Sequence, residues 1–126
     1  MKGKIRNQLV VIENGQLSSY MLDDRLVWEV GRASRNHMPD IRLYSETVSR
    51  KHGKFQNVDG VWFYMDYYGK NATVSRGKHM SAGVGGRTRP MMLKDRDVFI
   101  FGGGAEAVIN HKTVWAMYVT HGSEER

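Results

Sequence analysis

The dipeptide Asp59-Gly60 constrains the fold more than any other feature, because it separates two short apolar segments. Residues 54–58 alternate polar with apolar side chains over most of their length, and residues 61–65 read Val-Trp-Phe-Tyr-Met. Two strands joined by Asp-Gly predict a tight hairpin, since both loop residues adopt positive φ in such a turn. Asn14-Gly15 marks another tight turn after the strand-like residues 9–12.

The rest of the chain continues this pattern of short strands and turns. Strand-like apolar segments stand at residues 26–30, 98–101 and 114–119, and 98–101 reads as a strand buried on both faces. No segment shows sustained helical periodicity, so the pattern predicts an all-β fold, a sandwich or a barrel. The longest irregular stretch, 76–90, contains Gly83-Val84-Gly85-Gly86 and is expected to be a mobile surface loop.

Composition narrows the class of protein and its partners. The 126 residues suit a single domain, and the absence of cysteine excludes disulfides and thiolate metal sites. No signal peptide or membrane helix follows the basic first residues, so a cytoplasmic protein is expected. The net charge of +6 favours acidic partners, although the basic residues are scattered rather than gathered in a nucleic-acid-binding arm. Residues 122–126 are polar and could be a cut made in a longer protein. A monomer or a part of a larger protein is expected.

Four sequence blocks in a fixed order carry a family resemblance. The blocks are Gly31-Arg32, then Asp40–Leu43 leading to Ser49-Arg50-Lys51-His52, then Asp66 with Lys70-Asn71-Ala72-Thr73, and finally Leu93–Asp97 leading to Phe101-Gly102. Their order resembles the forkhead-associated (FHA) family, whose pattern is Gly-Arg, Ser-Arg-x-His, Asn-Gly-Thr, then Gly-Asp and a final Gly. The resemblance covers residues 27–102. It implies one FHA domain over 1–126, a two-sheet antiparallel β-sandwich with recognition loops at one end.

The resemblance also implies binding of a phosphothreonine in an extended peptide, and the chemistry of the residues agrees. A phosphothreonine carries nearly two negative charges and three strong acceptor oxygens. The planar guanidinium of Arg32 can donate two parallel bonds to it, and the Ser49 hydroxyl offers another donor. Arg50 and Lys70 can add positive charge. In the family, positions matching Arg32, Ser49, Arg50 and often Lys70 contact the phosphate, and the one matching Asn71 holds the peptide main chain.

Other residues are expected to support the site or to modify it. The resemblance makes His52 a structural histidine that bonds loop backbone, and Gly31 leaves room for a close turn. Ala72 stands where the family has Gly, and Arg96 stands in the Gly slot of the last turn. Both departures bear on backbone geometry. The loop after Thr73 is longer than typical, which bears on selectivity beside the phosphothreonine.

Further motif matches are weaker. Asn71-Ala72-Thr73 fits the N-glycosylation pattern without a secretory signal, and residues 83–86 lack the Lys-Ser/Thr ending of a P-loop. The five histidines do not pair at helical metal-ligand spacing, so no metal and no cofactor is predicted. No nucleophile, base and oxyanion donor form a recognisable set, so no enzyme is expected.

The leading hypothesis is a phosphothreonine-peptide-binding module that recruits a partner phosphorylated by a Ser/Thr kinase. The alternative is an FHA-like scaffold that docks a fixed, unphosphorylated partner, against which the intact Arg32, Ser49 and Asn71 argue. A nucleic-acid binder has only the net charge in its favour, and neither nucleic acid nor membrane is an expected partner. The sequence leaves open the partner, the kinase, the selected peptide residues and the oligomeric state.

Overall fold

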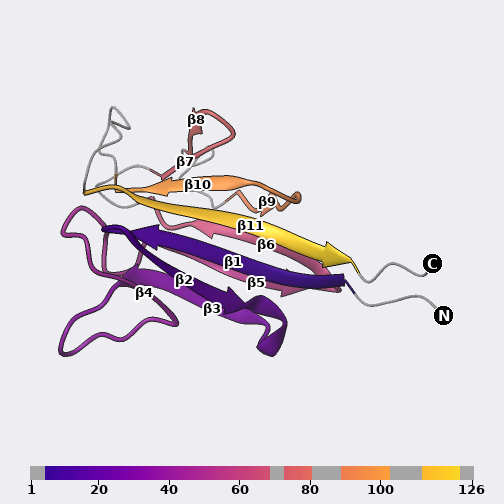
Figure 1. The fold of residues 1–126 in the computed structure, drawn as a ribbon, viewed down its shortest axis with the longest axis horizontal. Coiled ribbons are helices and arrows are strands. Elements are labelled where there is room, and N and C mark those ends of the chain that lie inside the picture. The colour runs from indigo at the N-terminus through magenta and orange to yellow at the C-terminus, as the bar shows by residue number, and fades with distance from the viewer. Residues whose placement is uncertain (1–4, 69–72, 81–88, 103–111, 123–126) are drawn as a thin grey trace.

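The computed structural model describes residues 5–68, 73–80, 89–102 and 112–122, and these form two packed β-sheets (Figure 1). The six-stranded sheet has the order β2-β1-β11-β10-β7-β8, and the five-stranded sheet has the order β4-β3-β5-β6-β9. The strands of the first sheet are β1 (Ile5–Glu13), β2 (Gln16–Met21), β7 (Thr73–Ser75), β8 (Lys78–His79), β10 (Val98–Phe101) and β11 (Val114–Gly122). Those of the second are β3 (Val27–Arg32), β4 (Ile41–Leu43), β5 (Gly53–Val58), β6 (Val61–Asp66) and β9 (Met91–Met92), and a 3-10 helix, η1 (Leu22–Asp24), follows β2.

The predicted all-β fold and two-sheet sandwich are confirmed, with one exception to the antiparallel pairing. Strand β4 pairs in parallel with β3, with Val30 opposite Ile41. The chain between these two strands therefore runs back past the end of β3 before β4 begins at the edge of the sheet. The chain that follows β4 then lies beside the end of β3, where Arg32 is opposite Leu43.

The core lies between the sheets and is centred on aromatic rings from both. Phe55 of β5 and Tyr64 of β6 meet Phe99 of β10, with ring centroids 4.9 to 5.4 Å apart. All three side chains are fully buried. Burial of apolar rings is the main stabilising term in such a sandwich, and their edge-on and tilted contacts add specificity.

Both predicted tight turns are confirmed by backbone angles. Asn14 and Gly15 have φ of 49° and 75°, and Asp59 and Gly60 have φ of 52° and 86°. These turns join β1 to β2 and β5 to β6 as antiparallel pairs. A third turn of the same kind at Arg76-Gly77, with φ of 53° and 72°, joins β7 to β8.

Two sequence interpretations need correction. The stretch 76–90 was expected to be irregular, yet it begins with the turn and strand of the β7–β8 hairpin; its glycine cluster at 83–86 lies outside the described residues. Strand β10 was expected to be buried on both faces. Only Phe99 and Phe101 are buried, whereas Val98 and Ile100 face outward and are half-buried.

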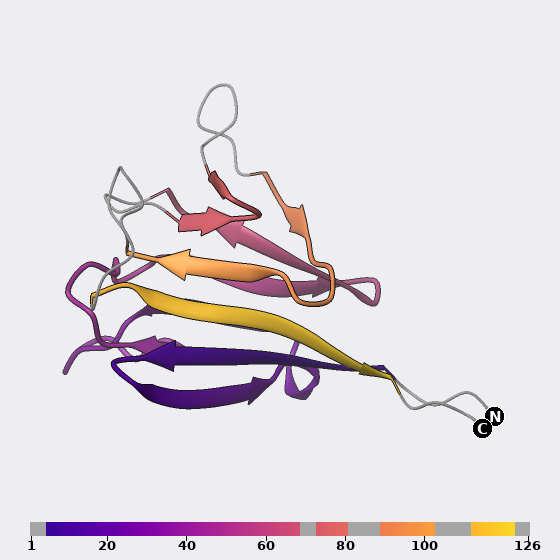
Figure 2. The same cartoon turned by 45° about the horizontal axis from the view of Figure 1, so that its top comes forward.

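The start of β1 and the end of β11 lie side by side, because Ile5 pairs with Gly122 (Figure 2). They stand at the opposite end of the sandwich from the β1–β2 turn. Among the described residues there is no helix of the length and apolarity that crossing a membrane requires.

Candidate functional site

The loops that follow β3 and β4 meet at one end of the sandwich. The amide of Arg32 donates a hydrogen bond of 3.0 Å to the carbonyl oxygen of Ser49. A Cβ atom on Gly31 would lie 1.7 Å from the carbonyl oxygen of Arg50, so any larger residue would force the two segments apart. The predicted role of Gly31 thus has a direct steric cause. The structure brings Arg32, Ser49 and Arg50 together as neighbours.

Their side chains are only partly engaged within the described residues. The half-buried guanidinium of Arg32 donates from Nη1 to the carbonyl oxygen of Glu46 at 3.1 Å. A guanidinium has five N–H donors, so most of this fork is available to a ligand. The Ser49 hydroxyl and the exposed Arg50 guanidinium have no hydrogen-bond partner in the part of the chain that the structure describes. The arrangement can therefore donate to an anion from both loops.

A buried, directional chain of hydrogen bonds fixes the backbone at Ser49. The Ser49 amide donates to Nδ1 of His52 at 3.1 Å, so this ring nitrogen is unprotonated. The other ring nitrogen, Nε2, lies 2.8 Å from the hydroxyl of Thr73, and that hydroxyl donates to the Asp66 carboxylate at 2.6 Å. Since the Thr73 proton goes to Asp66, Nε2 carries the proton of the neutral ring. His52 thus bonds the loop backbone at Ser49 from a buried position.

The environment of His52 keeps its ring neutral. Burial lowers the pKa of His52 below its usual value, and the nearby charge of Asp66 only partly opposes that effect. The ring also packs edge-on against Phe101 at 5.2 Å between centroids. Asp66 is in turn held by the Tyr64 hydroxyl at 2.7 Å and the Tyr68 amide at 3.0 Å. Several hydrogen-bond donors therefore satisfy this buried carboxylate.

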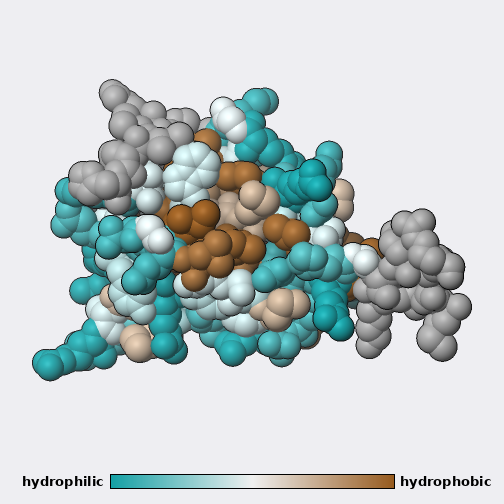
Figure 3. Space-filling model, viewed as in Figure 1, coloured by the Kyte–Doolittle hydropathy of each residue, from teal (hydrophilic) through white to brown (hydrophobic). Residues whose placement is uncertain are grey.

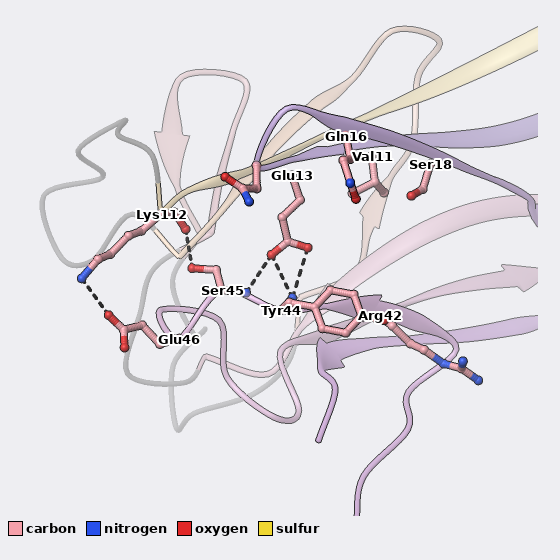
Figure 4. A pocket seen from close by; sticks show the side chains of 10 residues that line it. Val11, Glu13, Gln16, Ser18, Arg42, Tyr44, Ser45, Glu46 and Lys112 are labelled. Carbon is pink, nitrogen blue, oxygen red and sulfur yellow. Dashed lines mark hydrogen bonds and ion pairs between the residues drawn. The ribbon is translucent and has the colours of Figure 1, made fainter. Parts of the chain in front are cut away.

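The loop from β4 to β5 is also tied to β1 and to the chain before β11. The carboxylate of Glu13 accepts hydrogen bonds from the amides of Tyr44 and Ser45, at 2.8 and 2.7 Å (Figure 4). The hydroxyls of Ser45 and Thr47 both donate to the carbonyl oxygen of Lys112. These ties fix the segment whose next residues are the phosphate-site candidates.

The same loop contributes to two surface hollows. One, of about 570 Å³, lies between Tyr44, Glu46 and Lys112 and the outer strands β1 and β2 (Figure 4). The ammonium of Lys112 pairs with the Glu46 carboxylate at 2.7 Å, which lowers the pKa of Glu46 through a hydrogen bond and charge attraction. The other hollow, of about 710 Å³, is lined by Arg50 together with His37 and Tyr67. The surface is therefore hollowed on either side of the loop.

The fourth sequence block forms a turn held by Asp97. Its carboxylate accepts from the Lys94 amide at 2.7 Å and, in a two-pronged contact, from Nε and Nη2 of Arg76 at 2.9 and 2.6 Å. Burial acts to raise the pKa of Asp97, but these donors outweigh it and the net shift is downward. Arg96, which stands where the family pattern has Gly, has a φ of 71°. This left-handed backbone is easy for Gly but strained for Arg, which explains the family's preference for Gly at this position.

Some site residues lie outside the described ranges, and others were not predicted from the sequence. Lys70, Asn71 and Ala72 lie outside the described residues, so their contribution stays a prediction. Sequence reasoning gave no role to Glu13 or Thr73. Nothing in the sequence signals Glu13, whereas the last position of the Asn-Ala-Thr block could have indicated that Thr73 is structural.

Within the described residues, no group of three or more His, Asp or Glu side chains is placed to hold a metal ion. The loop end thus offers hydrogen-bond donors and positive charge as its means of recognition. Direct capture of an anionic group is the chemistry that these side chains support.

The chain is thus a two-sheet β-sandwich that carries basic and hydroxyl donors on the loops of one end. The sequence profile of the FHA domain matches residues 28–102. This match spans more than half of the 126 residues, so the chain belongs to the forkhead-associated family. A comparison with curated protein sequences finds no match.

Solved structures with the same fold include domains from different organisms. Full-length yeast Pml1p is 21% identical with a TM-score of 0.73, and the alignment covers 94% of this chain and 83% of that one. The FHA domain of the CT664 protein from Chlamydia trachomatis is 20% identical with a TM-score of 0.67, covering 90% and 96%. The yeast Dun1 FHA domain, in complex with a doubly phosphorylated peptide derived from Rad53, is 20% identical with a TM-score of 0.62, covering 98% and 80%. At these identities the likeness concerns the fold.

Proposed function

We propose that this chain is a phosphothreonine-peptide-binding module that mediates phosphorylation-dependent protein–protein interaction in cytoplasmic Ser/Thr kinase signalling. Arg32, Ser49 and Arg50 would hold the phosphate together with Lys70, and Asn71 would hold the peptide main chain. The module recruits its partner and does not act as an enzyme. Family membership supports this proposal, as do the phosphopeptide complexes among the structures of the same fold.

The observation that carries the proposal is the fixed approach of the Arg32 and Ser49 backbones, with most of their side-chain donors unengaged. The Arg32 amide bonds the Ser49 carbonyl at 3.0 Å, and the neutral ring of His52 holds the Ser49 amide at 3.1 Å. A site whose donors are fixed before binding loses less entropy when the ligand arrives. Charge-assisted bonds from a planar guanidinium then favour a phosphate dianion.

The test is a calorimetric titration at physiological salt with three probes. These are a phosphothreonine peptide, its unphosphorylated twin and a random oligonucleotide. Binding of the phosphopeptide alone supports the proposal. Equal binding of both peptides would favour the alternative of a scaffold that docks an unphosphorylated partner, and tighter binding of the oligonucleotide would favour a nucleic-acid binder.

A fourth probe, the same peptide with phosphoserine in place of phosphothreonine, tests whether the site selects the threonine. A pocket for the threonine methyl would contribute on the order of 0.8 kcal/mol from its burial. The methyl also stiffens the peptide side chain before binding, which lowers the ordering cost. We expect the phosphothreonine peptide to bind several-fold more tightly. Equal affinities would show that the site reads the phosphate without the methyl.

A further inference from the structure

The outward face of the six-stranded sheet carries a continuous row of apolar side chains across five strands. The strand registers pair each residue of the row with the next one on the neighbouring strand. A second row beside it joins β1, β11 and β10. The first row is Leu17, Ile12, Trp115, Ile100 and Val74, and the second is Val10, Met117 and Val98. We call these eight residues the outward patch.

Much of the outward patch is open to solvent. The exposed fraction of the residue is 69% for Leu17 and 47% for Ile12, and 38% and 39% for Trp115 and Met117. Figure 3 shows hydrophobic side chains gathered in the middle of this face, where Figure 1 places β1, β11 and β10, with hydrophilic residues around them. From the spacing of strands and of alternate residues, the patch spans on the order of 300 Å², which is at the lower end of the largest apolar patch on a monomer, a patch that is often functional.

The central strands of this sheet are apolar on both faces. In β11, Val114, Ala116 and Tyr118 face the core, while Trp115 and Met117 face outward. An antiparallel sheet with one solvated face normally alternates apolar with polar residues, and strands apolar on both sides belong to sheets covered on both sides. The apolar residues on both sides of β10 and β11 are therefore typical of a sheet whose outward face is covered by a partner.

A hollow with an apolar floor lies at the β7–β10 side of the patch. It has a volume of about 290 Å³ and is floored by Val74, Val98 and Ile100. Arg76 and Arg96 stand at its walls. The two turns that border it, residues 76–78 and 94–97, carry four basic side chains against two carboxylates, a local excess of +2 that matches the sign of the whole chain.

We propose that the outward patch docks a segment of a partner protein that carries carboxylates among its apolar side chains. The apolar rows and the hollow would take its apolar side chains. Arg96, which is 84% exposed, would pair with its carboxylates, because its nearest one, on Asp95, is 3.9 Å away. This surface is separate from the residues assigned to phosphopeptide binding and does not depend on them.

Size and charge favour this occupant over a second copy of the chain. A standard protein–protein interface needs roughly 800 Å² from each partner, more than twice the patch. Two copies would also bring like charges together, since each has a net charge of +6. A single docked segment needs less area and gains from the charge.

The test is a selection of random dodecapeptides displayed on phage against the immobilised domain, with soluble Ile100→Thr as competitor. We expect enrichment of peptides that combine Leu, Phe or Trp with Asp or Glu. The most enriched peptide is then synthesised and its affinity measured by fluorescence anisotropy. Ile100→Thr and Trp115→Thr should each weaken it at least about tenfold, Arg96→Glu should weaken it several-fold, and Arg96→Lys should leave it unchanged.

Matched controls keep the result decisive. Phe63→Thr removes an outward apolar side chain of the other sheet and should not affect the peptide. Thermal melts show which variants are folded, and Trp115→Thr replaces Ile100→Thr as competitor if the latter does not fold. Failure to enrich any peptide, enrichment of Lys- and Arg-rich peptides, or binding that survives both Thr variants would overturn the proposal.

Two further outcomes would also overturn it, by assigning the patch to another occupant. One is sedimentation of the wild type as a dimer that Trp115→Thr disperses. The other is co-sedimentation of the wild type, but not of Trp115→Thr, with vesicles of phosphatidylcholine and phosphatidylglycerol. A phosphothreonine peptide should still bind Trp115→Thr, so that a failure of the proposed phosphopeptide function would be seen separately.

Discussion

The loop end of the sandwich and the outward patch present their side chains by different means. At the loop end, the backbones of Arg32 and Ser49 are held by a buried polar chain through His52, Thr73 and Asp66. On the outward patch, strand register alone sets the positions of the apolar side chains. A change at the loop end should therefore alter site geometry, stability and pH dependence together, whereas a change on the patch should alter only what binds there.

The largest effect that would separate the two regions is loss of phosphopeptide binding in Arg32→Ala. Removing a two-pronged, charge-assisted donor leaves the phosphate with unmet acceptors, at a cost of roughly 2–5 kcal/mol in binding free energy. That is at least a tenfold loss of affinity and up to several thousandfold. Calorimetric titration with the phosphothreonine peptide measures it.

Two variants calibrate that result. Arg32→Lys should recover only part of the affinity, because an ammonium supplies charge without the planar fork. Lys2→Ala, a change far from the motif residues in sequence, should bind like the wild type. Wild-type affinity in a folded Arg32→Ala protein would contradict the assignment of the site.

Gly31→Ala should give the next largest effect, and it acts through the backbone. The added Cβ would meet the Arg50 carbonyl oxygen at 1.7 Å, so the loops at Arg32 and Arg50 must separate. We expect a loss of roughly 1–3 kcal/mol or more in the free energy of unfolding, with a fall in phosphopeptide affinity. Urea unfolding and titration check both, with Gly122→Ala as control because a Cβ there meets nothing within 4 Å. Unchanged stability would mean that the loops can part without cost.

A smaller effect should appear when pH falls through the titration range of His52. Because the folded pKa of His52 lies below its unfolded value, the unfolded chain takes up the proton first. The contribution to stability is complete above the unfolded pKa, about 6.5, and declines below it until the folded pKa is passed. The slope should not exceed about 1.4 kcal/mol per pH unit for this one proton.

Urea unfolding at a series of pH values measures this slope. His52→Asn keeps an acceptor near the Ser49 amide but does not titrate, so it should show a shallower slope below pH 6.5. An identical slope in wild type and variant would mean that His52 does not control the acid response.

The smallest effect should come from the outward patch. Trp115→Thr puts a β-branched residue, which favours strands, in place of a partly exposed ring, so stability should change by about 1 kcal/mol or less. Phosphopeptide affinity should stay the same, since Trp115 faces outward while Thr73 and the polar chain behind Ser49 are buried on the other side of the sheet. A loss of phosphopeptide binding in this folded variant would show that the two regions are coupled after all.

The sequence was most informative where one residue type has a narrow use. The Asp59-Gly60 and Asn14-Gly15 turns were predicted because few residues tolerate the positive φ that both positions adopt. Strand β2 was not predicted, because its Gln-Leu-Ser-Ser-Tyr-Met sequence is largely exposed and owes its position to pairing with β1. The short strand β8 was missed since a two-residue pairing has no periodicity to detect.

The site shows a similar division between local and distant causes. Arg32, Ser49 and His52 stood in recognisable blocks, and their meeting follows from the family pattern. The brace from Glu13 to Tyr44 joins residues with no pattern in common, 31 positions apart, so only the fold could reveal it. The apolar residues of β10 predicted burial on both faces, but only Phe99 and Phe101 are in the core, and Val98 and Ile100 lie on the outward face.

The pairing of Ile5 with Gly122 has a practical consequence for handling the domain. Since the two ends of the sandwich chain are adjacent, a short linker could join them, and the ring could be reopened at the exposed Asp59-Gly60 turn. Such a circular permutant would have its new termini at the far end from Arg32 and Ser49. Attached to a bead or fused into a loop of a host protein by that end, it would leave the recognition loops facing solution.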